Sequence, residues 1–523
     1  MRSALVPNSP NPGSFYARGA FPSPGQARQR EPRPFAVAKI FPIRQTGKIR
    51  NISVGGPPLD THTDASADAT QSHSAPGLPR VLGVSHATAI VVGTIIGSGI
   101  FLVPYEMIRA TGASSLVYLA WIAGGLLSLF GAMTYAELST LLPYAGGEYV
   151  YIRGAYGDLP AFFYMWTWFA VAKPASIASS TIGLARVMAI FPSLHWLNAP
   201  ALRIPFVVHW SQLFAIAAAW LITGLNYLGI RKAGNFQLIF TWLKVVLILA
   251  IVVICFGSFG GHWSNFATSF LGAHGGFGGF MIALIAALWA YDGWNDLTMV
   301  AGEVKNPQRS LPIALIAGLA IVGVLYMATN AAIQYLLPAA RIAASPRPAV
   351  AALAAITGPW GAELVSIAMA VSIIVSLNGT IMSGARIPYA AARDGLFFRR
   401  MADVHPRFQS PSTSLIVQGL LTTALLLAVG RFQQLFELAI FAEWLFYMIT
   451  ATTIFYYRKR DQGKQVFHVW GYPYIPALFI LAAAVLLVYS YVENLESSLI
   501  GTVIILAGAA LYPLFRKSAS AIS

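Results

Sequence analysis

Residues 93–101 read GTIIGSGIF and residues 289–296 read WAYDGWND, and each stretch interrupts a long apolar segment. The first stretch has glycines at positions 93, 97 and 99, and each glycine destabilises a helix by about 1 kcal/mol relative to alanine. The second stretch places two carboxylates, a glycine and an asparagine at a depth where a membrane helix is normally apolar. We therefore expect both helices to be broken at these stretches.

The positions of the two stretches in the chain support this interpretation. They lie in the first and sixth apolar segments, so each begins one half of a ten-helix core. A GxxxG pair alone, such as Gly93 and Gly97, is equally typical of close helix packing in membranes. Interrupted helices at corresponding positions of two repeats instead indicate the central binding site of a secondary transporter. The two halves show no similarity residue by residue, so the repeat is inferred from topology and motif position.

Broken helices of this kind favour a zwitterionic ligand. Unwinding frees N–H groups at the N-terminus of one half-helix, where an anion is stabilised. It also frees carbonyls at the C-terminus of the other half-helix, where a cation is stabilised. An α-amino acid carries both charges close together, so facing half-helix ends form a receptor for it.

The composition is that of a polytopic membrane protein. Of the 523 residues, 57% are hydrophobic and 10% are charged, whereas soluble domains carry about 25% charged residues. Apolar segments of about 20 residues predict an all-α membrane protein with twelve transmembrane helices. Their approximate spans are 84–109, 114–141, 159–190, 208–229, 236–257, 279–301, 312–337, 361–391, 413–430, 434–457, 473–492 and 497–515.

The distribution of charge orients these helices. With the N-terminus in the cytoplasm, the inner loops carry about three times as many Lys and Arg residues as the outer loops. This bias predicts that both termini lie inside. The same bias indicates that the net charge of +15 faces anionic lipid rather than nucleic acid.

The composition also divides the chain into domains. Residues 1–80 are rich in proline and polar residues, so we expect a disordered cytoplasmic tail, although a translation start near Val81 would explain the same pattern. We expect a transporter domain at 81–515 and a short C-terminal tail at 516–523. Within the transporter domain we expect repeats at about 84–257 and 279–457, followed by two extra helices at about 473–515.

Four ordered motifs resemble the amino acid–polyamine–organocation (APC) superfamily and, within it, the L-type amino acid transporter family. They are GTIIGSGIF, YAELSTLLPYAGGEYVYIRGAYG at 135–157, AYDGWND followed by VAGEVKNPQRSLP at 290–312, and RIPYAAARDGLFF at 386–398. The resemblance covers about residues 81–515. It implies a LeuT-like 5+5 inverted-repeat bundle and a multi-pass permease of the cytoplasmic membrane that transports amino acids.

The resemblance also implies where an amino acid binds. Its carboxylate would meet the N–H groups of Ser98 and Gly99, and its amino group would meet carbonyls at both breaks. The family usually has phenylalanine where this chain has Trp289, a departure that resembles members accepting cationic as well as neutral amino acids. The expected substrate-binding residues are Ile95, Gly97, Ser98, Gly99, Trp289, Ala290, Tyr291 and Asp292.

Lys244 is the main candidate for a coupling residue. It lies about nine residues from the inner end of the fifth apolar segment, where an ionisable side chain is costly and snorkelling covers only part of the distance. The resemblance implies that its ammonium takes the place of a sodium ion bound in LeuT-type carriers. It would tie the first broken segment to the eighth helix near Ser376, Asn378 and Ser383.

The remaining buried charges have competing interpretations. Asp292 could bind a cationic substrate or carry a proton, but adjacent turn residues favour a capping role. We expect Asp296 and Glu303 to fix the inner part of the sixth helix and Glu137 to meet a cytoplasmic arginine. Lys173 precedes Pro174, whose ring frees a carbonyl that can accept the ammonium.

Sequence patterns exclude several other functions. The chain has no GxxxxGK[ST] or HExxH motif and no GxSxG around Ser98, so we expect no enzyme, no cofactor and no metal. Mammalian relatives tether a glycoprotein through an extracellular cysteine. The loop at 191–207 has none and Cys255 is the single cysteine, so we expect no disulfide-linked heavy-chain partner.

These observations predict a sodium-independent secondary transporter that exchanges neutral L-amino acids by alternating access. Two alternatives stay open. One is proton-coupled symport through Lys244 or Asp292, and the other is exchange of cationic with neutral amino acids.

Overall fold

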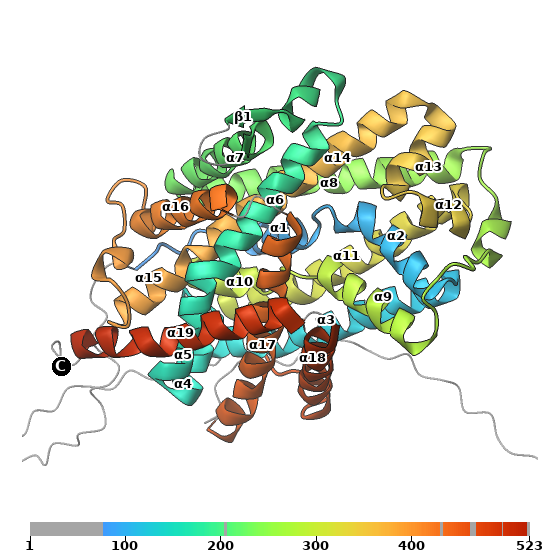
Figure 1. Cartoon of the computed structure of the whole chain (residues 1–523). Helices are drawn as coiled ribbons and strands as arrows, with labels where there is room; N and C mark the ends of the chain where they lie inside the picture. Colours follow the sequence, from blue (N-terminus) through green and yellow to red (C-terminus); the bar gives the residue numbers. More distant parts are fainter. Residues whose placement is uncertain (1–76, 203–206, 429–431, 461–466, 494, 520–523) are drawn as a thin grey trace, which may run out of the picture. The chain divides into compact units, whose positions relative to one another are not determined.

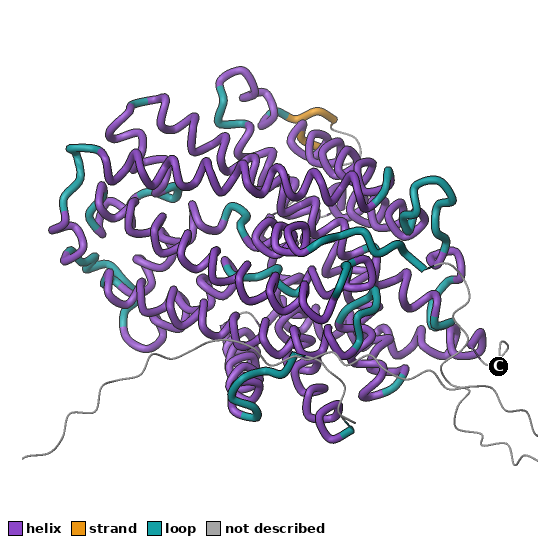
Figure 2. Tube along the Cα trace, turned by 180° about the vertical axis from the view of Figure 1, so that it is seen from behind, coloured by secondary structure: helices purple, strands orange, loops and turns teal. Residues whose placement is uncertain are grey.

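The computed structural model describes residues 77–202, 207–428, 432–460, 467–493 and 495–519. The predicted tail at 1–80 lies almost entirely outside these residues. Helices form nearly all of the described chain, and two short strands lie at one edge beside α7 (Figures 1 and 2). These strands, β1 (Pro200–Leu202) and β2 (Val208–His209), pair in antiparallel fashion.

The elements follow one another in two series. The helices of the first series are α1 (Val84–Ile95), α2 (Gly99–Thr111), α3 (Ser114–Leu141), α4 (Glu148–Tyr156), α5 (Asp158–Thr167), α6 (Lys173–Met188), α7 (Trp210–Tyr227) and α8 (Ile230–Gly257). A single π-helical turn, Trp168–Ala172, joins α5 to α6, and 3-10 turns lie at Pro192–Asn198 and Trp263–Ala267.

The second series begins after residue 275. Its helices are α9 (Gly276–Ala290), α10 (Asp296–Met299), α11 (Pro307–Leu336), α12 (Ala339–Ala344), α13 (Pro348–Thr357), α14 (Pro359–Gly384), α15 (Arg386–Arg393), α16 (Ser412–Ala428) and α17 (Phe432–Lys459). Two further helices follow, α18 (Tyr474–Glu493) and α19 (Leu495–Ala519), and 3-10 turns lie at Ala301–Glu303 and Arg399–Ala402.

Apolar length sets how many helices can cross a membrane. Among the described residues, six helices are long and apolar enough to do so, and the bent pair α1 and α2 makes a seventh. Large apolar side chains face outward from several of these helices, such as Val253 and Val324, which are 68% and 70% exposed. Such a surface suits lipid rather than water.

The two series interlock around α1. Helix α1 packs against α8 of its own series and against α11 and α14 of the second (Figure 1). Helix α9 packs against α2 and α3, and α10 packs against α14 and α1. The largest buried apolar cluster joins these same helices. This packing brings the two sequence stretches that begin the series into contact.

Candidate functional site

The first break lies where the sequence predicts it. Helix α1 ends at Ile95, α2 begins at Gly99, and the two axes are bent by 42°. The glycines in this stretch differ in their surroundings. A Cβ atom on Gly93 would lie 2.2 Å from Nε2 of Gln237 on α8, whereas one on Gly97 would have no contact closer than 4.0 Å. Gly93 therefore permits close helix packing, and Gly97 borders open space.

The second break also lies at the predicted stretch. Helix α9 ends at Ala290, residues 291–295 form a turn, and α10 begins at Asp296. Gly293 has φ of 101°, and a Cβ atom there would lie 3.0 Å from Cγ2 of Thr94 in the first break. A Cβ atom on Gly99 would lie 3.4 Å from Cα of Ala290. The N-terminus of α2 thus faces the C-terminus of α9.

A tyrosine that sequence reasoning did not select joins the two breaks. The hydroxyl of Tyr326 on α11 lies 2.7 Å from the carbonyl oxygen of Ala290 and 3.2 Å from that of Ile95. Its single hydroxyl hydrogen lies within reach of both carbonyl oxygens, which the sequence analysis expects to meet a substrate amino group. Each carbonyl oxygen keeps a second lone pair. Nothing in the local sequence distinguishes this tyrosine from a packing residue.

Lys244 supports the first break from the side of α8. Its fully buried ammonium donates to the carbonyl oxygens of Gly93 and Ile96, both at 2.6 Å. Ser376 on α14 donates to the carbonyl of the intervening Thr94 at 2.8 Å. The C-terminus of α1 is therefore held from two sides.

The structure corrects the expected tie between Lys244 and α14. Asn378 donates to Gln237 at 2.7 Å and accepts from Asn226 at 2.9 Å, and Ser383 donates to a carbonyl of its own helix. The hydrogen bonds of the ammonium go to the carbonyls of Gly93 and Ile96 rather than to either of these side chains. The link to α14 runs through the backbone of the first break, where Lys244 and Ser376 bind neighbouring carbonyls. Sequence spacing could not show which face of α14 each polar residue occupies.

A cavity of about 120 Å³ opens between the two breaks, with room for several water molecules or a small solute. Six of the eight expected substrate-binding residues line it, namely Ile95, Ser98, Gly99, Trp289, Ala290 and Asp292. Gly97 and Tyr291 lie outside the lining. Tyr291 is 1% exposed and packs edge-on against Trp121.

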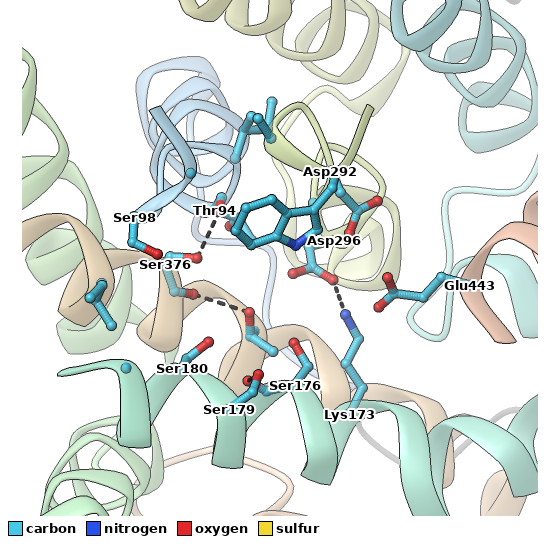
Figure 3. A pocket seen from close by; sticks show the side chains of 18 residues that line it. Thr94, Ser98, Lys173, Ser176, Ser179, Ser180, Asp292, Asp296, Ser376 and Glu443 are labelled. Carbon is cyan, nitrogen blue, oxygen red and sulfur yellow. Dashed lines mark hydrogen bonds and ion pairs between the residues drawn. The ribbon is translucent and has the colours of Figure 1, made fainter. Parts of the chain in front are cut away.

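One wall of the cavity carries hydroxyl groups that the sequence analysis did not select. Ser176, Ser179 and Ser180 project from α6 toward the cavity (Figure 3). Their spacing of three and four residues places them on one helix face. The pattern KPASIASS contained this signal, but serines on a membrane helix face are also typical of helix packing.

Charged side chains gather at one end of the cavity. The Lys173 ammonium lies 2.6 Å from Oδ1 of Asp296, and both side chains are buried. The predicted partner of Lys173, a carbonyl freed by Pro174, is therefore wrong, because a carboxylate from α10 binds the ammonium instead. Glu443 of α17 also lines this end and was not predicted (Figure 3).

Asp292 does not act as the helix cap that the sequence favoured. Its Oδ1 accepts a hydrogen bond from the Tyr447 hydroxyl of α17 at 2.7 Å. Helix α10 begins after Asn295 without a side-chain cap. The aspartate thus joins the second break to α17, which the sequence could not reveal because the two segments lie far apart in the chain.

Two further ion pairs join segments that lie far apart in the chain. Glu303 forms an ion pair with Arg386 at 2.8 Å, and both side chains are buried. This ion pair is consistent with the structural role expected for Glu303. Glu137 pairs with Arg458 and accepts from the backbone of Val469 at 2.6 Å. The predicted arginine partner of Glu137 is confirmed.

Comparison with known proteins places this architecture in a family. The family model described as amino acid permease matches residues 82–510. The chain belongs to the amino acid permease family, within the APC superfamily. The permease is accordingly a multi-pass transporter of the cell membrane and not an enzyme.

Three relatives illustrate what this permease resembles. It is 31% identical to the serine/threonine exchanger of Bacillus subtilis over 84% of its own chain and 98% of that protein. It is 32% identical to the mouse b(0,+)-type amino acid transporter 1, over 84% of its own chain and 88% of that protein. It is 31% identical to the human cystine/glutamate transporter, over 84% and 85% respectively.

Proposed function

We propose that this permease is a sodium-independent exchanger of neutral L-amino acids that works by alternating access. The observation that carries this proposal is the facing pair of half-helix ends, α2 and α9, at a cavity lined by hydroxyl groups. The similarity to a serine/threonine exchanger supports small neutral substrates.

In this proposal the substrate is held mainly by main-chain groups. The carboxylate accepts from the N–H groups of Ser98 and Gly99 at the start of α2, where the helix dipole stabilises an anion. The amino group binds the second lone pairs of the Ile95 and Ala290 carbonyls, beside the Tyr326 hydroxyl. Trp289 covers the cavity next to Ala290.

The position of Lys244 supports the proposed sodium independence. Carbonyl oxygens freed at the C-terminus of a broken helix are suited to bind a cation. The ammonium of Lys244 already binds two of them, at Gly93 and Ile96. A resident cation on the chain removes the need for one from solution.

The proposal includes a complete membrane topology. The twelve expected segments form a LeuT-like 5+5 inverted-repeat bundle with both termini in the cytoplasm, the repeats at about 84–257 and 279–457 and two extra helices at about 473–515. Residues 1–80 and 516–523 are cytoplasmic tails. The single cysteine, Cys255, is buried, which supports transport without a disulfide-linked heavy chain.

Counterflow in liposomes tests the proposed function. Purified protein is reconstituted without sodium at equal pH on both sides, and labelled alanine, serine, leucine or arginine is added outside. Vesicles preloaded with the same unlabelled amino acid are expected to take up label, while empty vesicles do not. Filling of empty vesicles under an inward proton gradient would establish symport instead, and a requirement for sodium would contradict the role of Lys244.

A further inference from the structure

A row of three buried amide side chains runs from α7 through α14 and α8 to α1. Nδ2 of Asn226 lies 2.9 Å from Oδ1 of Asn378, and Nδ2 of Asn378 lies 2.7 Å from Oε1 of Gln237. Nε2 of Gln237 then donates to the carbonyl oxygen of Ala89 in α1 at 3.4 Å. The three side chains are at most 1% exposed, and none of them lines the substrate cavity. The row therefore acts on α1 and not on a bound substrate.

The main-chain end of the row sets the direction of its hydrogen bonds. A carbonyl oxygen only accepts, so the Gln237 atom that faces Ala89 is the NH2 nitrogen. The Gln237 oxygen is then left facing Asn378, which has to present its own NH2 group. Asn226 presents its NH2 group to the Asn378 oxygen for the same reason. Each amide is thus oriented by the next, as in other buried polar networks.

Two glycines leave room for the Gln237 amide. A Cβ atom on Gly93 of α1 would lie 2.2 Å from Nε2 of Gln237, and one on Gly379 of α14 would lie 3.4 Å from it. The Thr241 hydroxyl, one turn further along α8, donates to the same Ala89 carbonyl at 3.0 Å. Apolar packing would fill this space without any directional bond. Two side-chain donors at one carbonyl instead fix the orientation of α1 against α8.

The helix held in this way leads directly into the first break. Helix α1 has 12 residues and no side-chain cap at its N-terminus, and so short a helix is marginally stable by itself. Its orientation therefore depends on its neighbours. Ala89 and Ile95 lie on this one helix, and Ser98 and Gly99 follow it. A rotation of α1 at Ala89 displaces the main-chain groups proposed to bind the substrate.

We propose that Gln237 is a positioning residue for substrate binding, which holds α1 in the orientation that directs the main-chain groups of the first break into the cavity. Asn378 and Asn226 act through Gln237 by keeping its NH2 group directed at Ala89. This inference rests on the proposed function and extends it. Without the hydrogen bond, α1 occupies further orientations, and the apparent affinity falls with the fraction that stays competent to bind.

The test measures the KM for alanine in alanine–alanine exchange by the full chain in sodium-free liposomes. Gln237→Leu keeps a side chain of similar size that can neither donate nor accept. We expect its KM to rise about tenfold, while the maximum rate per folded molecule stays near the wild-type value. A role in folding alone would lower the amount of active protein and leave the KM unchanged. A wild-type KM in this variant overturns the inference.

Gln237→Glu gives a second test that is reversible in one sample. A neutral carboxyl group at this position can donate to Ala89 as the amide does, and burial favours the neutral form. An ionised carboxylate only accepts, so it repels the carbonyl. Relative to the wild type at the same pH, the KM should be near normal at about pH 5.5 and raised at least about fivefold at about pH 8.5.

The charged groups of the neighbouring helices leave this pH response to the introduced carboxyl group. Lys244 is the nearest charged residue along α8, and its ammonium is bound to main-chain carbonyls. His86 of α1 lies 2.9 Å from Oδ1 of Asn235. Glu363 is the one charged residue of α14 and lies about four turns from Asn378, and α7 has no Asp, Glu, Lys, Arg or His.

A KM of Gln237→Glu that stays raised at about pH 5.5 overturns the inference, because a neutral donor should restore the bond. If Gln237→Leu cannot be recovered folded, Gln237→Glu decides the question alone, and a KM that does not change with pH then overturns it. If the wild type does not exchange alanine, the proposed function itself fails. The two failures are therefore distinguishable.

Gln212 of α7 provides the matched control. Its buried amide donates to the carbonyl of Leu426 in α16 at 2.7 Å and accepts from the backbone of His209 at 2.8 Å. Like Gln237, it therefore donates one bond and accepts one, and it does not line the cavity. Gln212→Leu should melt at a lower temperature with an unchanged KM. A KM raised as much as in Gln237→Leu would show that loss of any buried amide has this effect, which overturns the inference.

Discussion

At the scale of single residues, Lys244 has the largest electrostatic role in the first break. Its ammonium makes two hydrogen bonds to main-chain carbonyls in a fully buried position. Hydrogen bonds to a charged group contribute about 1.5–3 kcal/mol each. The geometry of the carbonyls near the proposed substrate amino group therefore depends on this side chain.

Replacement of Lys244 by alanine should abolish most transport. Because loss of about 1.4 kcal/mol changes an equilibrium about tenfold, we expect exchange of alanine to fall at least about tenfold. The protein should still insert in the membrane, as judged by yield and size-exclusion profile. Lys232→Ala, at an exposed position on the same helix, is the control. Near-normal exchange by Lys244→Ala would refute the assigned role.

Two glycines in the first break should respond in opposite ways to the same substitution. Gly93→Ala introduces a methyl group that collides with Gln237 and Thr241, so we expect a lower melting temperature in detergent. Gly97→Ala introduces one into open space, so we expect near-wild-type stability, and because Gly97 directly precedes the Ser98 and Gly99 amides proposed to bind the carboxylate, we expect weaker alanine exchange. If Gly97→Ala is the unstable variant and Gly93→Ala is tolerated, the assignment of the two glycines is reversed.

At the scale of elements, the sequence located both helix breaks but not the groups that hold them. Breaks depend on local residues, such as the glycines around position 97 and the polar turn at 291–295, and local residues are visible in a sequence. The Tyr326 bridge, the Lys173–Asp296 pair and the Tyr447–Asp292 hydrogen bond join helices far apart in the chain. Such contacts depend on how each helix is rotated about its axis. A helix that is apolar on all sides has no clear sequence periodicity from which this rotation could be predicted.

Helix α4 provides a second support for the break in α9 and α10. Its first residue, Glu148, is fully buried and accepts from Asn295 in the turn. Burial raises the pKa of this carboxyl group from 4.5 to about 8, despite the hydrogen bond from Asn295 and the charge of Lys173, which lower it. The folded state therefore binds a proton at Glu148 over a pH range in which the unfolded chain does not.

This pKa shift predicts how stability depends on pH. Because the pKa of Glu148 is higher in the folded than in the unfolded state, its contribution should favour folding below pH 4.5 and decline as pH rises to about 8. Glu148→Gln should remove this decline and melt at a higher temperature than the wild type at pH 8–9. Melting temperatures in detergent between pH 5 and 9 measure this pH dependence. Glu363→Gln, at an exposed carboxylate of α14, is the control. An unchanged pH profile in Glu148→Gln would contradict the burial argument.

At the scale of the whole molecule, the family model matches residues 82–510, which confirms the family that the sequence motifs predict. Composition was sufficient to predict a membrane protein, because every helix that faces lipid must be apolar. The motifs were sufficient to predict the family. The expected twelve spans need an experiment of their own, since six or seven described helices have the length and apolarity to cross a membrane.

Cysteine labelling tests the proposed topology. In a Cys255→Ala background, Ala344→Cys lies at the exposed end of α12 in an expected outer loop, and Asp403→Cys lies exposed in an expected inner loop. An impermeant maleimide should label Ala344→Cys in intact cells and Asp403→Cys only after permeabilisation. The opposite pattern would invert the orientation, and labelling of both in intact cells would change the number of spans between them.

The central claim is that the facing ends of α2 and α9 bind an amino acid. A structure of the protein with the best-exchanged amino acid bound tests it most directly. We predict the substrate carboxylate within hydrogen-bonding distance of the Ser98 and Gly99 amides, with the amino group at the Ile95 and Ala290 carbonyls. Substrate density elsewhere, or a carboxylate bound by Lys173 in place of Asp296, would contradict the account.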